Sequence, residues 1–248
     1  MTQPYEYKKS KLHQEGVSLN ELADRFGTPA FVYSKARLIS CYRSLSDALS
    51  GLKFKINYSV KANSNLSLLA LLKEEGAGFD IVSAGELNRV LAIKGDPENV
   101  VFSGVGKTSE EIDFALKNNV GCINVESESE LNRIINRARV LKRRAPVSIR
   151  VNPNVDPQTH PYISTGLKEN KFGVPITDSY ALFNLAHESE HLTIKGIDCH
   201  IGSQIGSVEP LAEAVKSLCK TIDQLEEHGI LIEHINVGGG LGVTYKDE

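Results

Sequence analysis

Polar and glycine residues that suit chemistry recur at the ends of short runs rich in valine and isoleucine. Each run has the composition of a strand buried on both faces of a sheet. In a sheet of parallel strands covered by helices, active sites collect where the carboxyl ends of the strands meet. The residues at these ends are Lys61, Asp80, Arg150, His200, Ser203, Gly238, Gly239 and Gly240. We therefore expect them to converge on one site.

Three of these residues are charged. A lysine in a partly desolvated position loses proton affinity, and its neutral amine can form a Schiff base with a carbonyl group. From its position alone, Lys61 fits a surface lysine equally well. Arg150 lies inside an apolar run, so it needs an anion nearby, either a bound ligand or an internal carboxylate. Asp80 has the converse need, and we expect it to form an ion pair with Arg150 or Lys61.

The glycines, the serine and the histidine suit an anion. Gly238, Gly239 and Gly240 present backbone N–H groups with no Cβ in the way, which allows close approach by a phosphate. A tight turn with unusual dihedral angles explains them equally well. Ser203 could donate to the same phosphate. A lone histidine in an apolar strand is more often a core residue, but its nearness to Ser203 favours a role for His200 in the site.

The surrounding pattern alternates strands with helices, which predicts an α/β fold with a parallel sheet. We expect strands at 28–34, 55–62, 78–83, 99–105, 122–127, 146–153, 194–203 and 234–240. We expect helices at 18–27, 35–50, 65–75, 84–94, 108–118, 128–143, 178–190 and 208–228. From residue 55 onward the pattern is that of a (β/α)8 TIM-type barrel with seven of its eight strands visible. A doubly wound open sheet is the second choice, because K-A-N-S-N follows the first of these strands where a dinucleotide fold would have its glycine fingerprint.

Composition limits the class of protein. The chain has 248 residues, 41% of them hydrophobic, and a net charge of −3, which argues against nucleic acid or an anionic membrane as partner. No stretch is apolar for long enough to cross a bilayer, and the first residues lack the apolar core of a secretory signal. The cysteines lack metal-ligand spacing, so we expect no metal site and a reducing cytoplasmic location.

Six stretches, taken in order, resemble one family. They are Y-S-V-K-A-N (58–63), G-F-D-I-V-S-A-G-E (78–86), R-V-N-P (150–153), T-G-L-K-E-N-K-F-G (165–173), H-I-G-S-Q (200–204) and V-G-G-G-L-G (237–242). Together they are similar to the fold-type III decarboxylases that use pyridoxal phosphate. The R-V-N-P and T-G-L-K-E-N-K-F-G stretches are most similar to the diaminopimelate decarboxylases rather than to the ornithine decarboxylases.

The resemblance implies a role for each residue. Lys61 would hold pyridoxal phosphate covalently, and His200 would stack on its ring. Ser203 and the glycines 238–240 would bind the phosphate, and Arg150 and Asp80 would lie around the ring and Lys61. The implied reaction is decarboxylation of meso-2,6-diaminopimelate to L-lysine, the last step of lysine biosynthesis. The implied assembly is a head-to-tail homodimer, with a small amino acid as substrate.

The resemblance also implies further parts. The family continues with an E-P-G-R strand, whose glutamate pairs with the pyridinium nitrogen, and with a C-terminal β-domain. Residues 1–34 would join that β-domain, and 35–248 would form the barrel, incomplete at its C-terminal end. Without the glutamate the electron sink is weaker, so we expect the chain by itself to be inactive or nearly so.

Other readings remain open. Within the same cofactor class, the chain could act on another diamino acid or be an alanine racemase, and a substrate panel distinguishes these. A non-catalytic homologue would bind pyridoxal phosphate without turnover. A Schiff-base aldolase barrel would use Lys61 without a cofactor and would be colourless.

Overall fold

The computed structural model describes residues 5–156 and 172–243, and its centre is a parallel sheet. The sheet order is β11-β10-β8-β7-β6-β5-β4, so each strand lies beside its neighbour in the sequence, apart from the small strand β9. The strands are β4 (Asn57–Ser59), β5 (Gly78–Ile81), β6 (Val100–Phe102), β7 (Cys122–Val125), β8 (Ala145–Asn152), β10 (Leu192–Asp198) and β11 (His234–Asn236). Strand β9 (Val174–Pro175) pairs with the end of β8. The predicted α/β barrel fold is confirmed, as seven parallel strands that form an open half-barrel.

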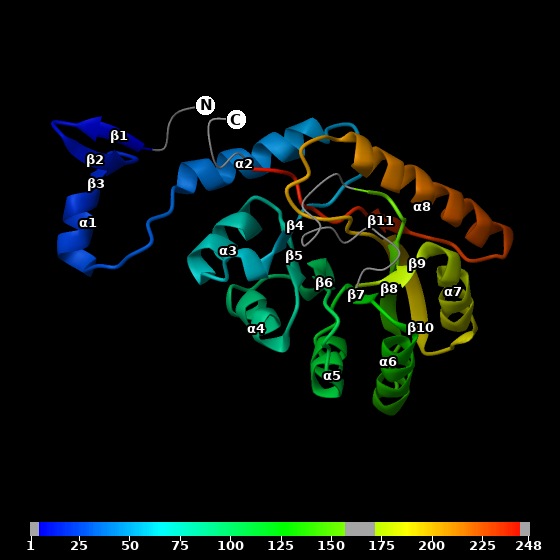
Figure 1. The fold of residues 1–248 in the computed structure, drawn as a ribbon. Coiled ribbons are helices and arrows are strands. Elements are labelled where there is room, and N and C mark those ends of the chain that lie inside the picture. The colour runs from blue at the N-terminus through cyan, green and yellow to red at the C-terminus, as the bar shows by residue number, and fades with distance from the viewer. Residues whose placement is uncertain (1–4, 157–171, 244–248) are drawn as a thin grey trace.

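Helices cover the outer face of this sheet. They are α3 (Leu66–Glu74), α4 (Ala84–Ala92), α5 (Ser109–Lys117), α6 (Glu128–Leu141), α7 (Ser179–Glu188) and α8 (Glu209–Glu227). Helix α2 (Lys35–Ala48) precedes them and packs against α3. Figure 1 shows α3 to α7 following one another in an arc around the strands. Several begin at a side-chain cap: Ser83, Thr108 and Ser127 each accept a hydrogen bond from the backbone N–H three residues later. The predicted helices are confirmed, with ends shifted by a few residues.

The main core lies between the sheet and the helices. Strand side chains alternate between the two faces of a sheet, so Phe79 and Ile81 of β5 are buried in this core. Asp80, which lies between them, points to the opposite face and hence into the barrel. The other strands alternate in the same way. Their apolar side chains pack against the helices, and the polar side chains between them face the barrel interior.

The N-terminal segment differs from the expected pattern. Three strands, β1 (Tyr5–Lys8), β2 (Lys11–Gln14) and β3 (Val17–Ser18), form a small antiparallel sheet that precedes helix α1 (Leu19–Phe26). The sequence pattern did not predict this sheet. The strand expected at 28–34 is wrong: these residues have no ladder partner among the described residues, and Phe31 is 90% exposed. Aromatic and β-branched composition favours a strand only where a neighbouring strand completes the ladder.

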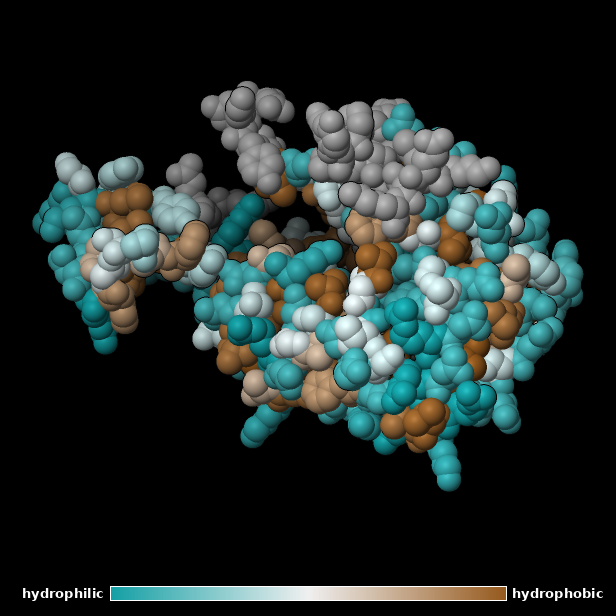
Figure 2. Space-filling model, turned by 60° about the horizontal axis from the view of Figure 1, so that its bottom comes forward, coloured by the Kyte–Doolittle hydropathy of each residue, from teal (hydrophilic) through white to brown (hydrophobic). Residues whose placement is uncertain are grey.

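This segment stands apart from the barrel. Figure 1 shows β1–β3 and α1 at one side, joined to α2 by an extended stretch, and Figure 2 shows the same segment projecting from the main body. It carries exposed apolar side chains, which are Tyr5, Tyr7, Val17 and Phe26.

The expected strands end earlier than the sequence pattern suggested. Strand β4 stops at Ser59, and Lys61 lies in the 3-10 turn Val60–Ala62 that follows it. His200 lies beyond the end of β10, and the three glycines lie beyond the end of β11. Most of the T-G-L-K-E-N-K-F-G stretch (165–173) falls outside the described residues. Within the described ranges, no helix is long and apolar enough to cross a membrane.

Candidate active site

The predicted site residues lie along one edge of the half-barrel. Each follows or ends a parallel strand on the carboxyl side, so the chain direction alone places them on the same rim. Lys61 is exposed, since β4 is an edge strand of the open sheet. Its positive charge contributes to the pKa shifts of both Glu86 and His200. Residues from opposite edges of the sheet therefore share one electrostatic environment.

Asp80 belongs to a polar chain across the barrel interior. Its carboxylate accepts hydrogen bonds from Ser59 Oγ at 3.1 Å and Ser103 Oγ at 2.5 Å, which come from the two neighbouring strands. The Asn124 side-chain amide in turn donates to Ser103 Oγ at 3.1 Å. The expected ion pair of Asp80 with Arg150 or Lys61 is not found among the described residues. Serine hydroxyls satisfy this carboxylate instead.

Arg150 has the internal anionic partners that its apolar strand required. Its Nη1 lies 3.2 Å from both carboxylate oxygens of Glu126, and its Nε lies 3.9 Å from Asp198 Oδ2. The Phe172 ring lies 5.4 Å from the guanidinium carbon, within cation–π range. Nε is buried and makes no hydrogen bond within the described part of the chain. Arg150 is thus held from two sides while one donor remains available.

Asp198 is a buried carboxylate on the inner face of the sheet, near Arg150. It is 4% exposed, and burial raises the pKa of its carboxyl to about 7. Arg150 lowers this pKa, but the negative charges of Asp80 and Glu126 raise it. Asp198 therefore takes up a proton near neutral pH.

His200 and the glycines form a cradle at the ends of β10 and β11. The Gly239 backbone N–H donates to His200 Nδ1 at 3.3 Å. A Cβ on Gly238 would lie 2.7 Å from His200 Nδ1, and one on Gly240, where φ is +93°, would collide with the Gly202 carbonyl oxygen. Gly239, in contrast, faces open space, with nothing within 4 Å of a Cβ built there. The cradle therefore needs glycine on both sides and leaves room in the middle.

The histidine is neutral in this cradle. Burial, with the positive charges of Arg150 and Lys61, lowers the pKa of His200 to about 4. An unprotonated Nδ1 is also what accepting from Gly239 requires. The loop that carries Ser203 lies beside the glycines, since the Ile205 N–H donates to the Gly240 carbonyl at 2.9 Å. The structure thus brings together His200, Ser203 and the three glycines.

Four charged residues of this region were not predicted from the sequence: Glu86, Lys107, Glu126 and Asp198. Glu126 and Asp198 continue the inward-facing alternation of β7 and β10, and this spacing was the available signal. Glu86 lies in the first turn of α4, where burial raises the pKa of its carboxyl. Lys107 gave no signal, because a lysine in a loop is usually exposed.

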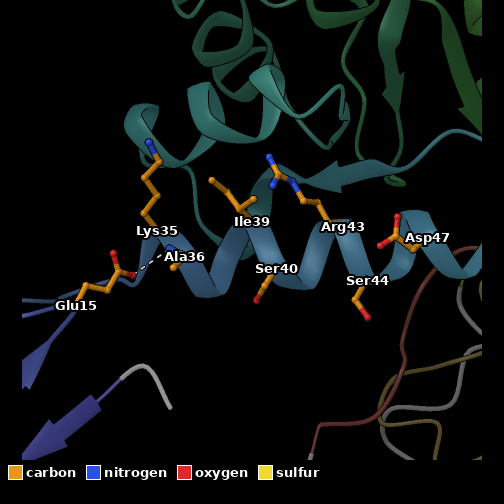
Figure 3. Close-up of a pocket in the computed structure, with 8 residues that line it drawn as sticks. All are labelled: Glu15, Lys35, Ala36, Ile39, Ser40, Arg43, Ser44 and Asp47. Carbon is orange, nitrogen blue, oxygen red and sulfur yellow. Dashed lines mark hydrogen bonds between the residues drawn. The ribbon is translucent and has the colours of Figure 1, made fainter. Parts of the chain in front are cut away.

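A second hollow lies away from this rim. It has a volume of about 660 Å³ and follows helix α2. Figure 3 shows Lys35, Ile39 and Arg43 pointing to one side of the helix and Ser40 and Ser44 to the other. Arg43 is already paired with Glu75, at 2.6 Å. The side chains do not converge, and we assign no ligand to this surface.

Comparison with known proteins identifies the family. The model of the pyridoxal-dependent decarboxylase, pyridoxal binding domain, matches residues 35–248. The chain belongs to the pyridoxal-dependent decarboxylases. The match begins where α2 begins, so it contains the half-barrel and every candidate site residue. The predicted cofactor class, pyridoxal phosphate, is confirmed at the level of the family.

Several relatives within this family are similar to this chain over nearly its whole length. The diaminopimelate decarboxylase of Pseudomonas aeruginosa is 53% identical over 98% of this chain and 59% of its own length. A structure of diaminopimelate decarboxylase from Helicobacter pylori, complexed with L-lysine, superposes with a TM-score of 0.89 at 43% identity, over 93% of this chain and 58% of that one. Lysine decarboxylase from Selenomonas ruminantium has a TM-score of 0.83 at 24% identity, covering 97% of this chain and 58% of that one, which shows the shared fold only. The chain spans a little under three fifths of the length of these relatives, and the resemblance to diaminopimelate decarboxylases is confirmed.

The residues present fit pyridoxal phosphate. Gly238 and Gly240 let this loop pack closely against the segment that carries His200 and Ser203, and the open space at Gly239 suits a phosphate. Arg150 has an unpartnered buried donor, and Lys61 supplies the exposed amine that a covalent link requires. The donor set is therefore that of an anion site on the same rim as a lysine amine.

Proposed function

We propose that this chain carries the pyridoxal-binding domain of an enzyme that decarboxylates meso-2,6-diaminopimelate to L-lysine and carbon dioxide. The observation that carries the proposal is the convergence of Lys61, His200 and the glycine cradle on one rim. The 53% identity to a diaminopimelate decarboxylase over nearly the whole chain supports the choice of substrate.

Each residue has a role that follows from its surroundings. Lys61 would hold the cofactor through its amine, and Ser203 with the backbone N–H groups of the 238–240 loop would bind the phosphate. Neutral His200 would offer an uncharged ring face for stacking, since a protonated imidazole would repel the neighbouring Arg150. When bound, pyridoxal phosphate supplies the electron sink for the bond that carbon dioxide leaves.

Arg150 and the interior carboxylates would orient the site. Arg150 is fixed by Glu126 on one side and Asp198 on the other, so its position does not depend on a ligand. Asp80 is fixed by two serines, and its negative charge reaches Asp198 and Glu86. These groups keep the rim polar and leave Lys61 as the exposed amine.

We also propose that residues 1–34 are a unit separate from the barrel domain at 35–248, and that this unit packs on a further β-domain. The family match begins at residue 35, and the N-terminal segment exposes Tyr7, Phe26 and Phe31 at 76%, 67% and 90%. Side chains of this size are usually covered by a partner surface. Limited proteolysis tests the boundary: cleavage should fall between α1 and α2 and leave the barrel intact.

A cytoplasmic homodimer is the assembly that we propose from the family resemblance. All four cysteines are free thiols, as a reducing compartment requires. Sedimentation velocity of the protein over a range of concentrations checks the dimer, and a single species with the mass of one chain at every concentration contradicts it.

Cofactor attachment is the first experiment. The chain is incubated with pyridoxal phosphate, its visible absorbance is recorded, and borohydride reduction followed by peptide mass mapping locates the adduct. We expect the adduct on Lys61, none in Lys61→Ala, and an unchanged adduct in Lys53→Ala, an exposed lysine before the same strand. An adduct spread over surface lysines, or none, contradicts the proposed site.

The substrate is tested on the cofactor-loaded chain. Meso-diaminopimelate, L-ornithine and L-alanine are each titrated against the visible band, and carbon dioxide release is followed in parallel. Meso-diaminopimelate should perturb the band at the lowest concentration. A stronger response to L-ornithine or to alanine would support one of the alternative activities instead.

A further inference from the structure

A fully buried lysine lies behind the candidate site, in the loop between β6 and α5. The side chain of Lys107 is 0% exposed, and its Nζ donates to the carbonyls of Gly104 and Asn124, at 2.5 and 2.7 Å. The third donor goes to Glu130 Oε1, at 2.9 Å. An ammonium group has three N–H donors, so all of them are used. The Phe102 ring lies 5.6 Å from the same nitrogen.

Glu130 connects this lysine to the start of α6. Its Oε2 accepts the backbone N–H of Glu126 at 2.7 Å, while its own N–H donates to the capping hydroxyl of Ser127. One carboxylate therefore holds both the lysine and the last residue of the β7 segment. Glu130 is 3% exposed, so this arrangement lies outside the reach of bulk water.

The β5–α4 unit contains the same turn without the lysine. There, Glu86 Oε2 accepts the Val82 N–H at 2.8 Å, and the Glu86 N–H donates to Ser83. A helix start of this form thus needs only the serine and the glutamate. The lysine is an addition at α6, and the turn that it reinforces carries Glu126, whereas the other turn carries a valine.

Glu126 is the link to the cofactor site. Its side chain is 2% exposed and contacts Arg150 Nη1, while the Gly104 N–H donates to the same carboxylate at 3.0 Å. Lys107 binds the carbonyl of Gly104 as well as the side chain that fixes Glu126. The lysine therefore fixes both backbone groups that determine where the Glu126 carboxylate lies.

We propose that the buried pair Lys107–Glu130 positions Arg150 for the cofactor by fixing the turn that carries Glu126. This rests on the proposed cofactor site. A buried ion pair contributes little net stability compared with apolar side chains of similar size. The pair instead fixes the position of Glu126. Removing Lys107 frees the Gly104 carbonyl, and removing Glu130 frees the Glu126 N–H. Lys107 and Glu130 are positioning residues, since neither is on the rim itself.

The test separates positioning from stability. Lys107→Met alone would leave the Glu130 carboxylate buried without its cation, so the double variant Lys107→Met/Glu130→Gln is used, which removes both charges. Glu130→Asp keeps the negative charge beside Lys107 and shortens the side chain by one methylene, so it is the milder variant. The matched control is Arg137→Met/Asp113→Asn, which removes an ion pair of 2.6 Å between helices α5 and α6 of the same two βα units. Melting temperature and the dissociation constant for pyridoxal phosphate are measured for all.

We expect the dissociation constant to rise roughly tenfold in the double variant, the equivalent of about 1.4 kcal/mol. The control should change it less than twofold at a similar melting temperature. Hydrogen exchange should also become faster at the amides of Gly104 and Glu126 in the double variant. Unchanged affinity in the double variant, or an equal loss in the control, overturns the proposal. Should the double variant fail to fold, Glu130→Asp decides by the same two measurements.

The experiments distinguish a failure of the proposed function from a failure of the positioning role. If the unsubstituted chain forms no adduct on Lys61, the cofactor site is wrong. If it forms the adduct and the variants bind equally well, only the positioning role is wrong. The exchange measurement needs no cofactor, so it reports on the Glu126 turn in either case.

Discussion

Asp198→Asn should make the protein more stable at alkaline pH and leave it unchanged in acid. Asp198 is 4% exposed, and burial raises the pKa of its carboxyl to about 7. An unfolded chain ionises an aspartate near the ordinary value of about 4. Because the folded pKa is the higher one, the stability that this group contributes is complete below about pH 4. It is lost as the pH rises through about 7.

The magnitude follows from the interval between the two pKa values. At about 1.36 kcal/mol per pKa unit, the interval from about 4 to about 7 corresponds to roughly 4 kcal/mol. This is an upper bound, because Arg150 can move closer to an ionised Asp198 than the present 3.9 Å. Asparagine has the shape of the protonated carboxyl and does not titrate. The free energy of unfolding of the variant should therefore exceed that of the parent by up to about 4 kcal/mol near pH 8.

Urea unfolding from about pH 5 to about pH 8 measures this difference. His200 acts in the opposite direction: its lowered pKa gives stability that is lost as the pH falls from about 6.5 to about 4. Subtracting the parent's free energy of unfolding from the variant's at each pH largely cancels that contribution.

Asp113→Asn is the control, and its effect on stability should have the opposite sign, because the Arg137 guanidinium lowers the pKa of Asp113. Its removal should cost at most about 1 kcal/mol at neutral pH, since the pair is partly exposed. A difference for Asp198→Asn that does not grow with pH refutes the reasoning.

Three further predictions concern the rim and a helix start. Gly240→Ala should destabilise the protein by about 1–3 kcal/mol, because φ is +93° and a Cβ meets the Gly202 carbonyl, whereas Gly239→Ala should leave the melting temperature unchanged and weaken pyridoxal phosphate binding. Equal melting temperatures for both variants would contradict this. His200 should titrate near pH 4 by NMR, and a midpoint above about 6 would show that the ring is not desolvated. Thr108→Ala should lower the free energy of unfolding by about 1 kcal/mol in urea unfolding, because it removes the capping box of α5, and no loss would mean that water replaces the hydroxyl.

Local patterns in the sequence were enough for the sheet and most helices. Runs such as G-F-D-I-V-S and C-I-N-V-E-S carry the β-branched composition of buried parallel strands, and the cap residues Ser83, Thr108 and Ser127 stand directly before the helical patterns. These signals depend only on residues that are close in the chain, so they can be read from the sequence alone. The 28–34 segment shows the limit: its composition favours a strand, but a strand also needs a partner elsewhere, and none lies beside it among the described residues.

The sequence by itself therefore determined the strand order, the edge at which the site lies, and the positions of Lys61, His200 and the glycines. Each follows from chain direction and from residues that are adjacent in sequence. Only the tertiary structure decided the partners of the buried charges. Arg150 forms ion pairs with Glu126 and Asp198, and Lys107 forms a buried ion pair with Glu130. Asp80 accepts hydrogen bonds from two serines. Such pairings join residues from different strands and helices, and which carboxylate meets which cation depends on distances of a few ångströms that only the packed sheet sets.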